Sequence, residues 1–207
     1  MTHVQDGLMT VSQAEFTRGF AAIQHAIATP RDKWLSTQIM NRTVWTNYKA
    51  YLAEQRRQAV RGNNDDINHM AICENCGQAD EHTEHIFVTC PIAGIVWKEL
   101  EDSLNYALRY VILDPDDSQR DHLPMKFSKS NIIYMKPTFS RNVQDTVNDI
   151  LILGKRLIYS SRLTMSHPDT IPIRHALKGS LDILTSIRSS LALNFSIVHA
   201  CANFFTN

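Results

Sequence analysis

Three of the four cysteines of this chain, and two of its nine histidines, fall within residues 72–91, ICENCGQADEHTEHIFVTCP. The residues at metal-ligand spacing are a Cys-x2-Cys pair, a histidine and a further cysteine: Cys73, Cys76, His85 and Cys90. A Cys-x2-Cys pair can turn two thiolates toward one point through a tight hairpin, for which Asn75 and Gly77 are suitable turn residues. Three thiolates and one imidazole complete a tetrahedral Zn²⁺ site, and soft sulfur favours zinc over Mg²⁺ or Ca²⁺. The spacing therefore predicts one bound Zn²⁺ with these four residues as ligands.

The nitrogen ligand has a second candidate, because His82 also lies between the Cys-x2-Cys pair and Cys90. Its gap to Cys90 is looser, and we prefer His85. A catalytic zinc keeps one coordination position for water, whereas four protein ligands close the coordination sphere, so we expect a structural metal. The remaining cysteine, Cys201, lies in an apolar tail and is expected to be a buried free thiol.

Two glutamates beside the predicted site, Glu81 and Glu84, raise the possibility of a catalytic metal. Zinc deaminases use a glutamate within an H-x-E signature, and HTE at 82–84 contains that triplet. The P-C-x-x-C that must follow downstream in those enzymes is missing, which argues strongly against a deaminase.

Composition and charge place the chain among ordinary globular proteins, with 43% hydrophobic and 20% charged residues. No apolar run approaches the ~18 residues of a membrane helix, and the N-terminus lacks the pattern of a signal peptide. We therefore expect an intracellular protein of the nucleus or cytoplasm, not secreted and not membrane-bound, in which clustered cysteines indicate metal binding. The formal net charge is zero, but residues 31–61 hold seven bases against two acids. A local face for a polyanion is compatible with this segregation.

Hydrophobic periodicity predicts a mainly α fold: a helical domain over residues 1–207 with one structural CCHC zinc knuckle near its middle. The expected parts are basic-aromatic helices at 12–60, the zinc knuckle and its following helix at 70–113, a polar loop at 114–140, and C-terminal helices at 141–207. Strand-like alternation is scarce, and NIIYM at 131–135 is the only short candidate.

Several helix boundaries can be predicted from local chemistry. Ser12 and Glu15 have the spacing of a capping box for a helix that runs to about residue 28. A second helical pattern covers about 32–60, with a candidate interruption at 41–46, and Pro91 suits the first turn of the helix after the knuckle. The last apolar stripe opens after Pro172 with the residues Ile173, Leu177, Leu181, Leu184, Ile187 and Leu191.

The segment 73–100 resembles the reverse transcriptase zinc-binding domain found toward the C-terminal end of non-LTR (LINE-type) retrotransposon polyproteins. That family's pattern is Cys-x2-Cys and Gly, an acidic residue and Thr shortly before His, an apolar pair, Cys-Pro and a downstream Trp. The corresponding residues here are Cys73, Cys76, Gly77, Glu81, Thr83, His85, Ile86, Phe87, Cys90, Pro91 and Trp97. The resemblance is detailed over this segment and looser outside it. It implies zinc bound by the three cysteines and His85, and a role in helping a reverse transcriptase of the same polyprotein to grip RNA or target DNA.

The residues before the knuckle independently offer chemistry for nucleic acid. Four aromatic residues interleave with five bases: Trp34, Trp45, Tyr48 and Tyr51 with Arg42, Lys49, Arg56, Arg57 and Arg61. Bases of this kind neutralise phosphates, and aromatic rings stack on nucleobases. The alternative is that the aromatic residues belong to the core and the bases to a solvated helix face. The same two interpretations apply to a second cluster, formed by Lys155, Arg156 and Arg162 around Tyr159.

Motifs for catalysis are missing from the chain. A reverse transcriptase carries an aromatic-x-Asp-Asp turn between strands. NNDD at 63–66 and DPDD at 114–117 lie instead in polar, turn-prone segments. Two-metal chemistry needs rigidly held carboxylates, and Asp116 and Asp121 fall in a predicted loop. We therefore expect a non-catalytic accessory domain that binds RNA or DNA. The alternative is a protein-interaction or scaffold module that docks onto a polymerase domain or a host factor, and a nuclease is the third candidate.

Overall fold

The computed structural model describes residues 12–63, 65–109, 125–137, 141–162, 170–191 and 196–206. Helices dominate these residues and no strand is found among them, so the predicted mainly α fold is confirmed. The elements are α1 (Gln13–His25), α2 (Pro30–Met40), α3 (Asn47–Arg61), the 3₁₀ turn η1 (Asn68–Ala71), the π-helical turn η2 (His85–Thr89), α4 (Pro91–Ala107), α5 (Lys129–Tyr134), α6 (Arg141–Ser161), α7 (Thr170–Ser190) and α8 (Ser196–Phe204).

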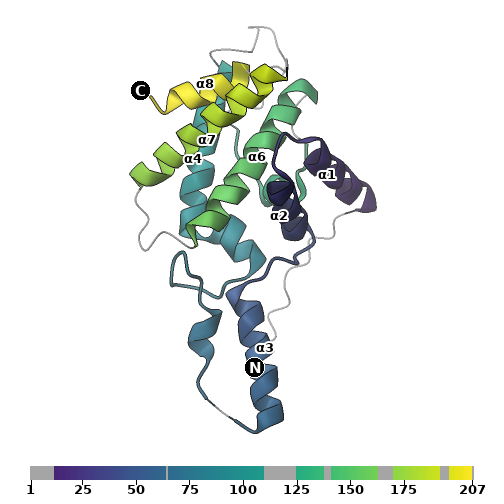
Figure 1. Ribbon diagram of the computed structural model, residues 1–207, viewed down its shortest axis with the longest axis vertical. Coiled ribbons are helices and arrows are strands. Elements are labelled where there is room, and N and C mark those ends of the chain that lie inside the picture. Colours follow the sequence, from purple (N-terminus) through teal and green to yellow (C-terminus); the bar gives the residue numbers. More distant parts are fainter. Residues whose placement is uncertain are drawn as a thin grey trace.

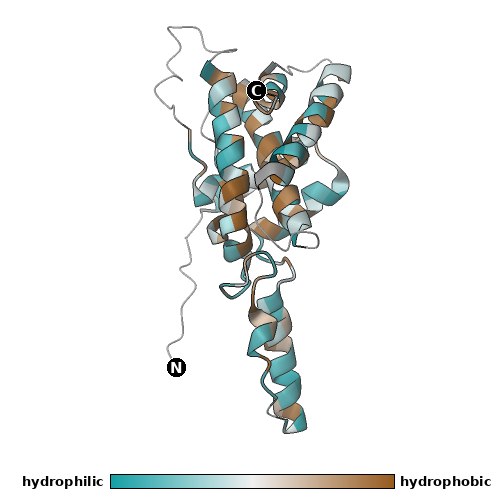
Figure 2. Cartoon of the chain, turned by 90° about the vertical axis from the view of Figure 1, so that its left-hand side faces the viewer, coloured by the Kyte–Doolittle hydropathy of each residue, from teal (hydrophilic) through white to brown (hydrophobic). Residues whose placement is uncertain are grey.

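The helices form a body and a projecting arm (Figure 1). In the body, α4 packs against α6, α7 and α8, while α1 and α2 pack against α6. The arm consists of α3 and η1, which pack against each other and extend away from the body. Figure 2 shows that hydrophobic residues concentrate in the body and that the arm helix is mostly hydrophilic. The arm therefore contributes little to the main hydrophobic core.

Helix boundaries in the first half of the chain follow the local signals. Ser12 and Glu15 form the predicted capping box at the start of α1, and Pro91 occupies the first turn of α4. The helical pattern at 32–60 is interrupted where the sequence indicated. Arg42 adopts a left-handed φ of 56°, and Thr46 caps α3 by accepting a hydrogen bond from the Lys49 amide.

One close approach in the body joins α4 to α6. A Cβ atom at Gly154 would overlap the Trp97 ring and would lie 2.9 Å from Leu100 Cδ1. The Trp97 indole nitrogen donates a hydrogen bond of 2.7 Å to the Phe87 carbonyl oxygen. Because Phe87 lies in η2, this buried hydrogen bond ties the segment that precedes α4 to the core of the body.

The predicted polar loop at 114–140 is wrong at residues 129–134, and the strand candidate at 131–135 is wrong as well. Residues 129–134 form helix α5, because Ser128 and Asn131 make a reciprocal capping box and Met135 ends the helix with a φ of 54°. Short apolar runs do not distinguish a buried strand from a buried helical turn. Of the rest of the predicted loop, residues 125–128 and 135–137 form no helix, and residues 114–124 and 138–140 lie outside the described residues.

Two sets of apolar side chains that the sequence pattern allows in the core are exposed instead. Trp34 and Trp45 are 63% and 62% exposed, which contradicts the interpretation that these aromatic residues belong to the core. On α7 the apolar stripe is buried as far as Leu184, whereas Ile187 and Leu191 are exposed. The buried residues of α7 are limited to one face, because that face packs against α4, α6 and α8.

Candidate metal centre

The first two candidate ligands lie on a short hairpin. The Cys73 amide donates to the Ala79 carbonyl at 2.9 Å, and the Glu81 amide donates to the Ala71 carbonyl at 2.7 Å. Between these two hydrogen bonds the chain reverses, with the Gly77 amide donating to the Cys73 carbonyl at 2.8 Å. Gly77 has a φ of 64°, a conformation that glycine adopts without steric cost. This hairpin brings the two thiols of the Cys-x2-Cys pair to the same side.

The other two candidate ligands lie at the two ends of the π-helical turn η2. The Cys90 amide donates to the His85 carbonyl at 2.7 Å, which is the i→i+5 hydrogen bond of a π-helix. In an α-helix, residues five apart are about a turn and a half apart and point in different directions. The wider π turn brings His85 and Cys90 close to the same direction, which resolves the difficulty that their spacing presents in an α-helix.

The four candidate ligand atoms converge. The Sγ atoms of the three cysteines and a ring nitrogen of His85 all lie within 4.8 Å of one another, and Cys73 and Cys90 are buried. The His85 Nε2 atom is 3.2 Å from Cys76 Sγ. Sulfur atoms at Zn–S distances of about 2.3 Å in a tetrahedron lie about 3.8 Å apart, so one ion fits between them. The donor set and its size are therefore compatible with a metal ion, and four protein donors leave no position for a reacting water.

The two candidate histidines have different surroundings. The second ring nitrogen of His85, Nδ1, lies 3.2 Å from the Thr89 hydroxyl oxygen, a contact that orients the ring and leaves Nε2 facing Cys76. His82 instead packs on the arm, with its ring centroid 3.9 Å from that of Tyr48. Geometry therefore groups His85, and not His82, with the cysteines.

Without a metal ion the buried thiols perturb each other. A hydrogen bond to Cys90, together with burial, raises the pKa of the Cys73 thiol, and the same hydrogen bond lowers the pKa of Cys90. Burial also lowers the pKa of His85, which favours the neutral imidazole that a metal requires. The group therefore offers three sulfur donors and one nitrogen donor that could hold a soft divalent cation.

Glu81, one of the two glutamates compared with a deaminase base, is fully occupied by structural contacts. Glu81 is buried and accepts hydrogen bonds from the amides of Asn47 at 2.8 Å and Glu74 at 3.3 Å. Its carboxylate also pairs with Arg162, with contacts of 2.5 and 3.2 Å. Glu81 therefore joins the start of α3, the hairpin and the end of α6. Glu84 pairs with Lys129 of α5 at 2.5 Å.

Sequence reasoning missed the role of Glu81 and Arg162, because the two residues are 81 positions apart. The only signal was the acidic residue in the zinc-domain pattern, which carries no information about its partner.

The five bases proposed for nucleic acid divide into two groups. Arg56, Arg57 and Arg61 are exposed on the outer half of the arm, where Arg57 pairs with Glu54 at 3.1 Å. Lys49 instead donates to the carbonyl oxygens of Arg42 and Val44, at 2.7 and 2.8 Å, and so closes the turn between α2 and α3. Arg42 is half-buried in the same turn.

The second basic cluster serves internal contacts. Lys155 is fully buried, with its amine 3.2 Å from Met135 Sδ. Arg162 is paired with Glu81, and Arg156 donates to the Ser180 hydroxyl at 3.0 Å. Of the acids weighed for catalysis, Asp65 and Asp66 are exposed beside the arm, and Asp116 and Asp121 lie outside the described residues.

Comparisons with protein-family models, with curated proteins and with solved structures found no match to this chain. Among the described helices, none is both long enough and apolar enough to cross a membrane.

Proposed function

We propose that this chain is a non-catalytic, zinc-stabilised domain that binds RNA or DNA, as the resemblance to the reverse transcriptase zinc-binding domain implies. Cys73, Cys76, His85 and Cys90 hold one structural Zn²⁺. The arm supplies the electrostatic part of the nucleic-acid contact. The partner domain in this proposal is a reverse transcriptase of the same polyprotein.

The exposure of the arm is the observation that carries the proposal. Helix α3 has 15 residues, none of which is buried, and it carries three exposed arginines. An isolated helix of this length is only marginally stable in water, so contacts at its base must hold it. A projecting helix that is not needed for the core and that is rich in guanidinium groups is suited to phosphate neutralisation.

The contacts at the base of the arm link it to the metal centre. The Asn47 amide at the start of α3 is bound by Glu81, and the Asn47 side chain donates to the Ile72 carbonyl at 2.9 Å. Tyr48 packs on His82, three residues before the ligand His85. An ion that holds the hairpin and η2 together would therefore also set the direction of the arm.

The experiment begins with elemental analysis of the purified full chain, for which we expect one zinc per molecule. Zinc-loaded protein is then titrated with a single-stranded oligonucleotide at several salt concentrations. Replacing Arg56 and Arg61 by Ala should weaken binding and lower the slope of log K against log salt by about 1.4, because each lost phosphate contact contributes about 0.7.

A matched control replaces Lys98 and Lys178, two lysines of α4 and α7 that each pair with an aspartate in the body. We expect this double variant to bind as the wild type does. Protein without zinc, binding that is insensitive to salt, or equal losses in the two double variants would contradict the proposal.

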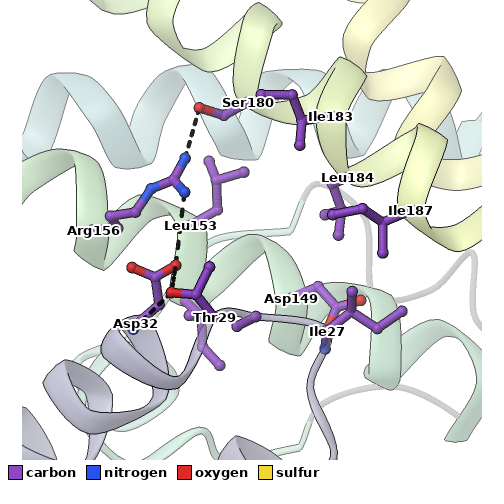
Figure 3. Close-up of a pocket in the computed structure, with 12 residues that line it drawn as sticks. Ile27, Thr29, Asp32, Asp149, Leu153, Arg156, Ser180, Ile183, Leu184 and Ile187 are labelled. Atoms are coloured by element: carbon purple, nitrogen blue, oxygen red, sulfur yellow. Dashed lines mark hydrogen bonds and ion pairs between the residues drawn. The ribbon is translucent and has the colours of Figure 1, made fainter.

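A specific observation favours protein docking as the second candidate function. A hollow of about 250 Å³ lies between the α1–α2 turn, α6 and α7, and Figure 3 shows Ile183, Leu184 and Ile187 on one side of it. Ile183 and Ile187 are exposed there, and Leu191 continues the apolar stripe one turn further on. Salt-insensitive association with a polymerase domain, in the absence of nucleic-acid binding, would favour this function over the first.

A further inference from the structure

A second hollow, distinct from the arm and from the metal centre, lies between α2 and α6. Its volume is about 380 Å³, close to the lower end of the range for small-ligand sites. The residues that line it are mainly aromatic or able to donate hydrogen bonds: Thr29, Arg31, Asp32, Trp34, Leu35, Gln38, Arg156, Tyr159 and Ser160. We call this hollow the Trp34 cleft.

The aromatic ring of Trp34 is available to a ligand. Its side chain lines the cleft and remains 63% exposed, although tryptophan is on average a highly buried residue. Tyr159 of α6 adds a second ring to the lining. The Arg162 guanidinium lies 5.2 Å from the centroid of that ring, which holds Tyr159 in place.

The charge in the cleft is mainly positive. Arg31 is exposed and makes no ion pair with any residue that the structure describes. Arg156 is 39% exposed, and Figure 3 shows its guanidinium held between Ser180 and Asp32. The one carboxylate, that of Asp32, already accepts a hydrogen bond of 2.8 Å from Thr29 Oγ1 and lies 3.7 Å from Arg156. An anionic ligand therefore meets one free and one positioned guanidinium.

We propose that the Trp34 cleft binds an unpaired nucleotide of a single strand, with its base stacked on Trp34 and its phosphate near Arg31. This inference rests on the proposed function and adds to it a second contact point, separate from the arm. A duplex keeps its bases stacked on one another, so only a single strand or a flipped base can present a free face to the ring. The size of the hollow suits one base rather than a run of them.

The two exposed tryptophans give the experiment a matched pair. Trp45 is as exposed as Trp34 but does not line the cleft, and the third tryptophan, Trp97, is buried. Zinc-loaded full-length variants Trp34→Phe and Trp45→Phe are titrated with a thymidine dodecamer, and the tryptophan fluorescence is recorded. We expect quenching in Trp45→Phe, which retains Trp34, and little quenching in Trp34→Phe.

Affinity supplies the second readout. Trp34→Ala should weaken binding of the dodecamer about 10-fold, within the range for one lost stacking contact, and should leave the salt slope unchanged. Arg31→Ala should lower that slope by about 0.7. An oligonucleotide of the same length with abasic sites throughout should bind the wild type and Trp34→Ala equally.

The outcomes separate the two proposals. A wild type that binds neither a single strand nor a duplex would overturn the proposed function and the cleft together, whereas one that binds a duplex but no single strand would overturn the cleft alone. Salt-dependent binding that is equally strong in Trp34→Ala, or quenching that follows Trp45, would overturn the cleft alone. Equal affinity of the wild type for a duplex and a single strand would also overturn the cleft, since a duplex has no free base to stack.

Discussion

Two buried residues with ionisable side chains, Glu81 and Lys155, are stabilised by their surroundings to very different degrees. Glu81 is surrounded by donors: two backbone amides and the bidentate guanidinium of Arg162. Lys155 is equally buried, yet the only hydrogen-bond partner of its amine among the described residues is the thioether of Met135. Burial of a charge is tolerated when hydrogen bonds and a counter-charge replace water, and it is costly when they do not.

Replacing Glu81 by Gln should destabilise the fold strongly. The substitution leaves Arg162 buried without its counter-ion, and breaking one side of a buried pair typically costs about 3–5 kcal/mol. The measurement is urea denaturation of the zinc-loaded protein. Glu84→Gln is the control, because Glu84 pairs with Lys129 at a partly exposed position, where the expected loss is below about 1 kcal/mol. Equal losses of unfolding free energy in Glu81→Gln and Glu84→Gln would contradict the central role of Glu81.

Lys155 should make stability depend on pH. Burial lowers the pKa of its amine to about 7, whereas the unfolded chain titrates at the ordinary lysine value of about 10.4. Between these values the unfolded state binds more protons than the folded state, so the contribution of Lys155 to the unfolding free energy rises with pH from about 7 to about 10. Below pH 7 Lys155 is protonated in both states, and the full free-energy cost of burying its charged amine remains.

The check on Lys155 compares the wild type with Lys155→Met by urea denaturation at pH 7 and at pH 9. The variant should be more stable than the wild type at pH 7, and this advantage should shrink at pH 9. Comparing the two proteins cancels the opposite effect of Cys201, whose burial raises the pKa of its thiol to about 12. A difference between the two proteins that does not change with pH would show that Lys155 carries no such linkage.

At the scale of elements, close helix packing in the body depends on small residues. Helix α6 approaches α4 at Gly154, where the Trp97 ring occupies the space of a side chain. Since Trp97 also holds η2 through the Phe87 carbonyl, the α4–α6 contact and the position of the candidate ligands are coupled. A displaced indole would disturb both.

Replacing Gly154 by Ala should therefore destabilise the protein by about 1–3 kcal/mol, the usual penalty for overpacking a core. Gly179→Ala is the control, because Gly179 lies in α7 with open space around it and a Cβ atom there meets nothing within 4 Å. Alanine in an open helix position should stabilise by up to about 1 kcal/mol. Thermal denaturation of the two variants checks the opposite signs, and a loss of the same size in both would refute the packing argument.

At the scale of the whole molecule, the body and the arm depend differently on the metal centre. The body has its own core, in which residues of α4, α6, α7 and α8 are buried together. The arm is connected to it through the hairpin, Glu81 and the His82–Tyr48 contact. Loss of the metal should therefore destabilise the arm more than the body.

Removal of zinc by a chelator should increase hydrogen exchange at residues 71–90 and in α3, while α4 and α8 keep most of their protection. The reason is that metal binding and folding of the hairpin are one equilibrium, whereas the helices of the body pack without it. Hydrogen exchange read by mass spectrometry on the full chain, with and without chelator, is the measurement. Uniform loss of protection, or none, would contradict this division. Cys76→Ser should show the chelated pattern even in excess zinc.

Local patterns predicted much of the architecture. The capping box at Ser12, the proline at the start of α4 and the interruption between α2 and α3 all depend on nearest neighbours, and each occurs where the sequence indicated. The predictions that were wrong concern burial and context. Helix α5 replaced a loop and a strand, and Ile187 and Leu191 of the predicted apolar stripe are exposed, because burial depends on which elements pack together.

The spacing of cysteines and histidine within a few turns of chain determined which residues could form a metal centre, since local geometry limits how far apart they can lie. The looser gap from His82 to Cys90 favoured His85, but spacing alone could not exclude His82, because that depends on which ring the arm covers. Only the tertiary structure brought Glu81 to Arg162, left Lys155 without a counter-ion among the described residues, and opened a cleft beside Trp34. Contacts between distant segments depend on how the whole chain packs, and no short stretch of sequence records them.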